Sequence, residues 1–110
     1  MFFIEVGDEA SGYQLTVEGY NGNAGDAVTI SSNANGMKFT TKDHDNDLRN
    51  GNCAVDTCAN CGHGGGWWYR ACSWAKINSP YNGTLGSFTW NALPTHPYKL
   101  AFSRMTLIQK

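Results

Sequence analysis

The sequence has few charged residues, few prolines and no long hydrophobic run. Charged side chains make up 15% of the 110 residues, the formal net charge is −1, and the basic residues are scattered along the chain. This balance gives no electrostatic basis for binding nucleic acid or an acidic membrane surface. No segment approaches the roughly 20 apolar residues of a membrane span. We therefore expect no nucleic-acid partner and no membrane insertion.

The N-terminal run turns charged at Glu5, too early for a signal peptide, so a secretion signal would lie outside this sequence. A chain of this length predicts a single domain over residues 1–110. Its 13 glycines and four tryptophans indicate a loop-rich fold held by aromatic side chains. Motifs typical of serine hydrolases or zinc proteases are absent, and we expect a protein that is not an enzyme.

The four cysteines are Cys53, Cys58, Cys61 and Cys72. An even number in a loop-rich chain favours disulfides formed in an oxidising, extracellular compartment, and three pairings are open. Zinc is the competing interpretation, because only two residues separate Cys58 from Cys61, and Cys53, Cys72 or His63 could complete a tetrahedral site. An iron–sulfur cluster is a more distant alternative, since Cys72 follows too early for the plant-type spacing.

Hydrophobic periodicity predicts short strands and little helix. Tyr13, Leu15 and Val17 alternate with polar residues, which is typical of a half-buried strand over residues 12–20. Further strands or extended segments are expected at residues 3–6, 37–40, 67–69, 88–90 and 98–108. Asp26 could cap a short helix over residues 27–30, and a helical turn is expected within residues 73–78.

The segment from residue 43 to residue 51 concentrates acidic and amide side chains. Asp43, Asp45 and Asp47 place carboxylates at every second position, where like charges repel one another. Alternating oxygen ligands followed by asparagine and glycine suit Ca²⁺, which binds carboxylates and backbone carbonyls. The loop lacks the central glycine and final glutamate of an EF-hand. We predict a calcium loop of another kind, with a solvated acidic turn as the alternative.

Four segments together resemble the fibrinogen-related domain, the globular module of fibrinogen chains, ficolins, tachylectins, tenascins and angiopoietins. They are GYNGNAGDA, NGMKFTTKDHDNDLRNGNCA, GGWWYRAC and YKLAFSRMTLI. The resemblance covers about residues 5–110 and corresponds to roughly the second half of a full family domain. It implies an α+β, loop-rich fold, with a short antiparallel sheet, one or two short helices and an extended subdomain for calcium and the ligand pocket.

The resemblance implies a specific set of calcium ligands. They are the side chains of Asp45 and Asp47 and the backbone carbonyls of Arg49 and Gly51, with Asp43 in a supporting position. Extracellular modules bind calcium weakly, with dissociation constants on the order of 10⁻⁴–10⁻³ M, which suits a structural role.

It also implies a disulfide between Cys53 and Cys72 beside the ligand pocket. A loop of about 20 residues closed in this way contributes roughly 3 kcal/mol in the chain-entropy model. Cys58 and Cys61 depart from the family pattern, and we expect them to pair with each other.

In lectins of this family, backbone amides at the second bridge cysteine and the next residue hold an acetyl group. Here those residues are Cys72 and Ser73, and the Ala71–Cys72 peptide bond is expected to be cis. A cage of aromatic and histidine side chains surrounds the acetyl group in acetyl-binding relatives. We expect Trp67 and Trp68 to belong to the core rather than to this cage.

The expected cage is altered in this chain. Ser73 stands where acetyl-binding relatives have histidine, and His63 stands where they have tyrosine. The segment that supplies another tyrosine is shortened around Thr84 and Leu85. The amides are therefore expected to persist as ligand-binding groups while the side chains around them differ.

These features predict a secreted, calcium-stabilised recognition module that binds a carbohydrate or acetylated ligand, as innate-immune lectins do. A protein-binding adhesion or signalling module of the same fold is the alternative. Asn82 begins an N-glycosylation sequence in a predicted surface turn, which fits secretion. An apolar face exposed by a shortened domain would favour a homo-oligomer.

Overall fold

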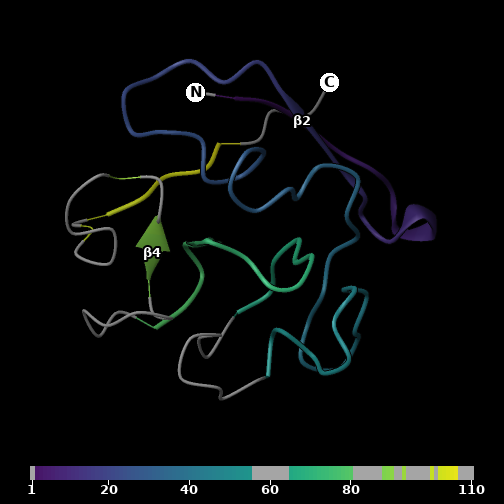
Figure 1. Cartoon of the computed structure of the whole chain (residues 1–110). Helices are drawn as coiled ribbons and strands as arrows, with labels where there is room; N and C mark the ends of the chain where they lie inside the picture. The colour runs from purple at the N-terminus through teal and green to yellow at the C-terminus, as the bar shows by residue number, and fades with distance from the viewer. Residues whose placement is uncertain are drawn as a thin grey trace.

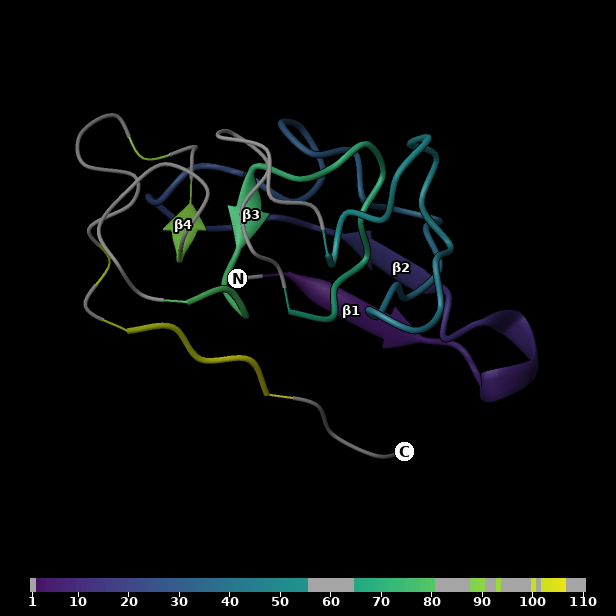
Figure 2. The ribbon, with the colours of Figure 1, turned by 90° about the horizontal axis from the view of Figure 1, so that it is seen from below.

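The computed structural model of the chain describes residues 2–55, 65–80, 88–90, 93, 100 and 102–106. Its regular elements are β1 (Phe3–Val6), the 3₁₀ helix η1 (Glu9–Ser11), β2 (Leu15–Glu18), β3 (Ala75–Lys76) and β4 (Thr89–Trp90). β1 pairs with β2 and β3 pairs with β4, which gives two antiparallel two-stranded sheets (Figure 1, Figure 2). Most other described residues form turns and loops, as the composition predicts. None of the described helices has the length and hydrophobicity needed to cross a membrane.

The β1–β2 hairpin follows the predicted alternation. Leu15 and Val17 are buried, whereas the residues between and after them are exposed. The carboxylate of Asp8 caps η1 by accepting the N–H of Ser11 at 2.9 Å. β2 is shorter than the predicted strand over residues 12–20, because Tyr13 has a φ of 55° and leaves the extended conformation just before it.

An irregular segment follows the free edge of β2 and leads into the acidic loop. The N–H of Leu15 donates to the carbonyl of Met37 at 2.9 Å, and the N–H of Gly36 donates to the carbonyl of Leu15 at 2.8 Å. The side-chain oxygen of Asn35 accepts the N–H of Val17 at 2.9 Å. These bonds satisfy the backbone of β2 without a third regular strand.

Trp67, Trp68 and Tyr69 form a buried anchor, as the sequence predicts. The backbone of Trp67 pairs with that of Thr40, which precedes the acidic loop. A Cβ atom on Gly66 would lie 2.6 Å from the ring of Phe39, so only glycine fits here. The buried core consists of Leu15, Val17, Ala27, Val28, Ala34, Met37, Cys53, Ala54, Trp67, Trp68, Tyr69 and Ala75.

Three predicted elements differ in the structure. Residues 27–30 form turns and no helix, although the carboxylate of Asp26 accepts the N–H groups of Val28 and Thr29 as a cap would; β-branched residues do not favour extending that turn. Residues 75–76 belong to β3 and not to a helical turn. Residues 102–106, part of the predicted strand over residues 98–108, run apart from the strands and pair with none of them (Figure 2); a segment becomes a strand only where it packs and pairs with a neighbour.

The core should respond strongly to truncation at Leu15, whose side chain is 2% exposed. Leu15→Ala is expected to lower the free energy of unfolding by about 2–5 kcal/mol, because it leaves a cavity in the buried core. The matched control is Ile30→Ala, at a side chain that is 82% exposed, which should change it by less than about 0.5 kcal/mol. Urea denaturation measures both, and equal effects would contradict the described core.

Candidate functional site

The acidic loop is tied to the buried chain that enters it by two asparagine side chains. Asn46 donates to the carbonyl of Phe39 at 2.8 Å, and its N–H donates to the hydroxyl of Thr40 at 3.0 Å. Asn52 donates to the carbonyl of Thr41 at 2.9 Å. These bonds close the loop around the aspartates.

Asp45 and Asp47 organise the backbone of the loop. Oδ1 of Asp45 accepts the N–H of Asp47 at 3.1 Å. The two carboxylate oxygens of Asp47 accept the N–H groups of Arg49 and Cys53, each at 2.9 Å. Burial raises the pKa of Asp47 despite these two hydrogen bonds, and the negative charge of Asp45 raises it further. The carboxylates of Asp45 and Asp47 therefore repel each other, and burial further disfavours the charged form of Asp47.

This pair of carboxylates fits the predicted calcium site. A divalent cation would relieve the repulsion between Asp45 and Asp47, and each Asp47 oxygen, with one N–H bond, keeps a lone pair for an ion. Arg49 and Gly51, the predicted carbonyl ligands, belong to the same loop. Among the residues that the structure describes, no three His, Cys, Asp or Glu side chains gather as a metal cluster. The set implied by the resemblance is of a different kind, with two carboxylates and two backbone carbonyls.

Asp43 stands apart from this pair. Its carboxylate accepts the hydroxyl of Thr41 at 2.7 Å, and this bond is the largest cause that lowers the pKa of Asp43. The side chain is fully exposed. This position is compatible with the supporting role expected for Asp43.

A disulfide joins the acidic loop to the segment that follows the tryptophans. Cys53 and Cys72 are bonded, with their Cα atoms 5.5 Å apart, which confirms the pairing that the resemblance implies. A zinc or iron–sulfur site using either sulfur is therefore excluded. A second link is the hydrogen bond from the N–H of Leu48 to the carbonyl of Arg70, at 2.8 Å. The guanidinium of Arg49 also contacts Sγ of Cys72 at 3.8 Å. The loop and residues 70–73 are thus connected through the bridge, the backbone and a side chain.

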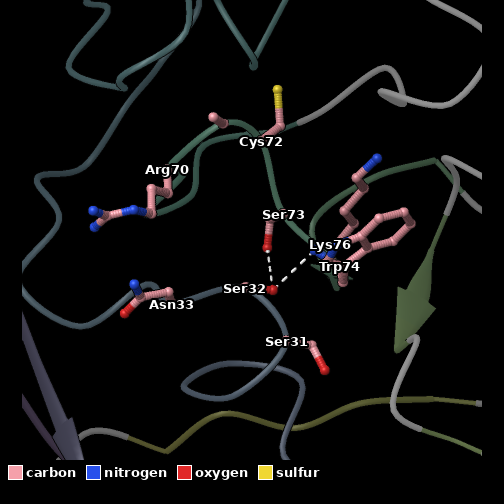
Figure 3. A pocket seen from close by; sticks show the side chains of 9 residues that line it. Ser31, Ser32, Asn33, Arg70, Cys72, Ser73, Trp74 and Lys76 are labelled. Atoms are coloured by element: carbon pink, nitrogen blue, oxygen red, sulfur yellow. Dashed lines mark hydrogen bonds between the residues drawn. The ribbon is translucent and has the colours of Figure 1, made fainter.

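A cavity of about 430 Å³ lies beside this bridge, lined by residues 31–33, residues 70–74 and Lys76 (Figure 3). It includes the predicted ligand-binding residues Ala71, Cys72 and Ser73. The Ala71–Cys72 peptide bond is cis, as expected. Within the described part of the chain, the N–H groups of Cys72 and Ser73 have no hydrogen-bond acceptor. Two residues of the cavity lining therefore carry backbone donors without an internal partner among the described residues.

The side chain of Ser73 belongs to the cavity wall itself. Its hydroxyl contacts that of Ser32 at 3.1 Å, and it accepts the N–H of Ala75 at 3.1 Å. The hydroxyl of Ser32 also accepts the N–H of Trp74 at 2.9 Å (Figure 3). Ser73 is buried, so its hydroxyl holds the wall in place. Its backbone N–H has no acceptor among the described residues.

Several predicted site residues lie outside the described residues, and their predictions stay untested. They are His63, Thr84, Leu85, Cys58, Cys61 and Asn82.

Sequence reasoning missed part of the cavity wall. Ser32 and Asn33 come from a turn some forty residues before Cys72 in the sequence, and no motif marked them. Trp74 and Lys76 come soon after Cys72 in the sequence, but a helical turn was predicted within residues 73–78. Lys76 was the one local signal for this wall, because lysine is rarely buried and this one lies in a strand that the structure buries.

Comparisons with known proteins agree with this geometry. The family model for the C-terminal globular domain of fibrinogen beta and gamma chains matches residues 2–110. Fibrinogen C domain-containing protein 1 of Mus musculus is 38% identical over 94% of this chain and 22% of its own length. Tenascin-R of Gallus gallus is 34% identical over 94% of this chain and 7% of its own length.

Solved structures agree as well. The fibrinogen-like globe domain of human ANGPTL2 superposes with a TM-score of 0.68 and 34% identity, over 86% of this chain and 43% of that chain. The chain belongs to the family of the fibrinogen C-terminal globular domain, as the sequence motifs indicate. It spans about a fifth of the length of the first curated relatives that it matches.

Tyr69 provides a pH test of the site. Burial raises its pKa to about 12 from the ordinary 10.0, and the negative charge of Asp47 adds to this. The folded state therefore binds the phenol proton more tightly than the unfolded state, so the associated stability is complete below about pH 10 and is lost as the pH rises toward about 12. Tyr69→Phe should make the free energy of unfolding fall less steeply across that range in urea denaturation.

The matched control is Tyr13→Phe, at a tyrosine that is 46% exposed. It should leave the alkaline slope unchanged. Identical slopes for wild type and Tyr69→Phe would contradict the burial of this phenol beside the acidic loop.

Proposed function

We propose that this chain is a secreted recognition module, stabilised by Ca²⁺ at the acidic loop, that binds an acetyl-bearing carbohydrate in the cavity beside the Cys53–Cys72 bridge. In this proposal the chain binds its ligand and does not act as an enzyme. The observation that supports this most is the pair of N–H groups at Cys72 and Ser73, which line the cavity and have no acceptor among the described residues. Two such donors suit the carbonyl oxygen of an acetamido group.

Calcium would act on this cavity through the backbone. Asp45, Asp47 and the carbonyls of Arg49 and Gly51 would hold the ion, which supplies charge neutralisation and no chemistry of its own. Arg49 and Cys53 are placed by the Asp47 carboxylate, and Cys53 is bonded to Cys72 at the cavity wall. An ordered acidic loop therefore restrains the peptide groups that meet the ligand.

A protein-binding module is the second candidate. Ser73 turns its hydroxyl into the wall, so the side-chain cage expected of acetyl-binding relatives is reduced at this position. A cavity with fewer side-chain contacts would hold a small acetylated sugar less tightly, and a larger protein surface would compensate with contacts around the rim.

Calcium stabilisation should depend on Asp45. In calcium buffer, Asp45→Ala is expected to lower the melting temperature to the value seen in EDTA, a loss of about 4–8 °C if the ion contributes ~1 kcal/mol. In EDTA the same change should have a much smaller effect, because no ion is lost and the loss of the hydrogen bond to the N–H of Asp47 is offset by relief of the repulsion between the two carboxylates. Calorimetry in the two buffers measures this. Asp43→Asn is the matched control and should keep its response to calcium. An equal loss in both buffers for Asp45→Ala would remove calcium from the proposal.

Acetyl recognition should be specific and sensitive to chelation. N-acetylglucosamine is expected to bind the full chain in calcium buffer and glucose is not, since only the former carries an acetamido carbonyl for the two N–H groups. EDTA should weaken binding, because the acidic loop then loses its order. Saturation-transfer NMR measures both. Equal signals for the two sugars, or none for either, would contradict the carbohydrate proposal and favour the protein-binding alternative.

A further inference from the structure

Several asparagines of this chain are followed directly by glycine. The structure describes three of these pairs, which begin at Asn21, Asn35 and Asn50. Asparagine is among the thermally labile residues. Before glycine, its side-chain carbonyl carbon is open to attack by the next backbone nitrogen, because glycine has no Cβ to obstruct a close approach. The attack closes a five-membered ring, and it requires that both the carboxamide and that nitrogen are free to move.

Asn50 differs from the two other asparagines of the acidic loop. The carboxamide of Asn46 donates to the carbonyl of Phe39 at 2.8 Å, and that of Asn52 donates to the carbonyl of Thr41 at 2.9 Å. Asn50 is exposed, and its carboxamide makes no hydrogen bond within the described part of the chain. Its side chain is therefore free to turn toward the following peptide group.

The backbone nitrogen of Gly51, which would make the attack, is equally unrestrained. Its N–H has no acceptor among the described residues. Residues 49–51 form bends and belong to no helix or strand, so no regular ladder of hydrogen bonds holds this peptide group. The chain is fixed on either side, where the N–H groups of Arg49 and Cys53 donate to the carboxylate of Asp47 at 2.9 Å. The two reacting groups thus lie in an open span between two fixed points.

Asn35 and Gly36 form the same pair of residues in a protected setting. Asn35 is also exposed, but its Oδ1 accepts the N–H of Val17 at 2.9 Å. The N–H of Gly36 donates to the carbonyl of Leu15 at 2.8 Å. Both reacting groups are therefore engaged at the edge of β2, and both hydrogen bonds must break before a ring can close there.

We propose that Asn50 is a site of spontaneous deamidation. The backbone nitrogen of Gly51 bonds to Cγ of Asn50, the bond from Cγ to Nδ2 breaks, and Nδ2 leaves as ammonia with the proton that Gly51 loses. Water then adds to either carbonyl of the resulting succinimide. The products are aspartate and isoaspartate, and in isoaspartate the main chain runs through the side-chain carbonyl. Water is consumed, ammonia is released, and no group is oxidised or reduced.

Either product changes the loop that carries Asp45 and Asp47. A carboxylate at position 50 adds negative charge to a loop in which two carboxylates already repel each other. Isoaspartate also lengthens the main chain by one methylene between the two points that Asp47 fixes. The acidic loop therefore changes as the protein ages. The inference goes beyond the proposed recognition function, because the reaction requires neither the ligand nor the ion.

The experiment compares Asn50 with Asn35 in one sample. The full chain is incubated at body temperature in mildly alkaline buffer with EDTA, and peptide mapping by mass spectrometry follows deamidation at both positions. Asn50 should react about tenfold faster than Asn35 or more, because only Asn35 must first lose two hydrogen bonds. In guanidinium chloride the two positions should react at similar rates, because each is followed by glycine. Enzymatic methylation of isoaspartate identifies the rearranged product.

Two variants complete the test. Asn50→Gln should remove the early deamidation product, because a larger ring would have to form. Gly51→Ala should slow the reaction at Asn50 and leave Asn35 unchanged; Gly51 is not among the described glycines with positive φ, so alanine is compatible with its backbone. Thermal unfolding checks that both variants fold, and the comparison within the wild type stands without them.

Equal rates at Asn50 and Asn35 in the folded chain would overturn this inference. So would a reaction at Asn50 that proceeds in guanidinium chloride and not in the folded chain. EDTA keeps the result independent of the calcium proposal. Fast deamidation at Asn50, together with a melting temperature that does not respond to calcium, would support this inference and remove calcium from the proposed function.

Discussion

The carboxylate of Asp47 is the contact on which the arrangement of the site depends. It is partly buried, accepts the N–H groups of Arg49 and Cys53, and lies close enough to Asp45 for that charge to raise its pKa. It thus fixes the end of the acidic loop at the point where the disulfide begins. The loop is joined to the cavity wall by the Cys53–Cys72 disulfide, by the hydrogen bond from Leu48 to Arg70 and by the contact of the Arg49 guanidinium with Sγ of Cys72.

Opposite charges are arranged on the two sides of this bridge. The acidic loop presents the carboxylates of Asp45 and Asp47, whereas Arg70 and Lys76 belong to the lining of the cavity. The disulfide between Cys53 and Cys72 and the hydrogen bond from Leu48 to Arg70 connect the acidic loop directly to the cavity wall. The bridge restricts how far the loop and the wall can move apart.

Local patterns predicted the parts of the fold that local physics controls. The alternation around Leu15 and Val17 predicts a half-buried strand, because side chains on a strand point to opposite faces in turn. The glycines before Trp67 predict a close backbone approach, and Gly66 does lie against the ring of Phe39. The pattern failed where pairing with a distant segment decides the structure. Residues 102–106, within the predicted final strand, form no strand, and Ala75 pairs with Trp90 instead of forming a helical turn.

The residues of the candidate site also fall into two groups, those predicted from local sequence and those placed only by the tertiary structure. Its acidic loop and its cysteines were recognised from motifs within one stretch of sequence, and the Cys53–Cys72 disulfide and the cis Ala71–Cys72 peptide were predicted through the resemblance to the family. Ser32 and Asn33 entered the site only through tertiary structure, since a turn some forty residues earlier packs against the segment after Cys72. Short-range order is encoded in neighbouring residues and can be read from them, whereas the closing of the cavity depends on which distant turn the hydrophobic core brings alongside.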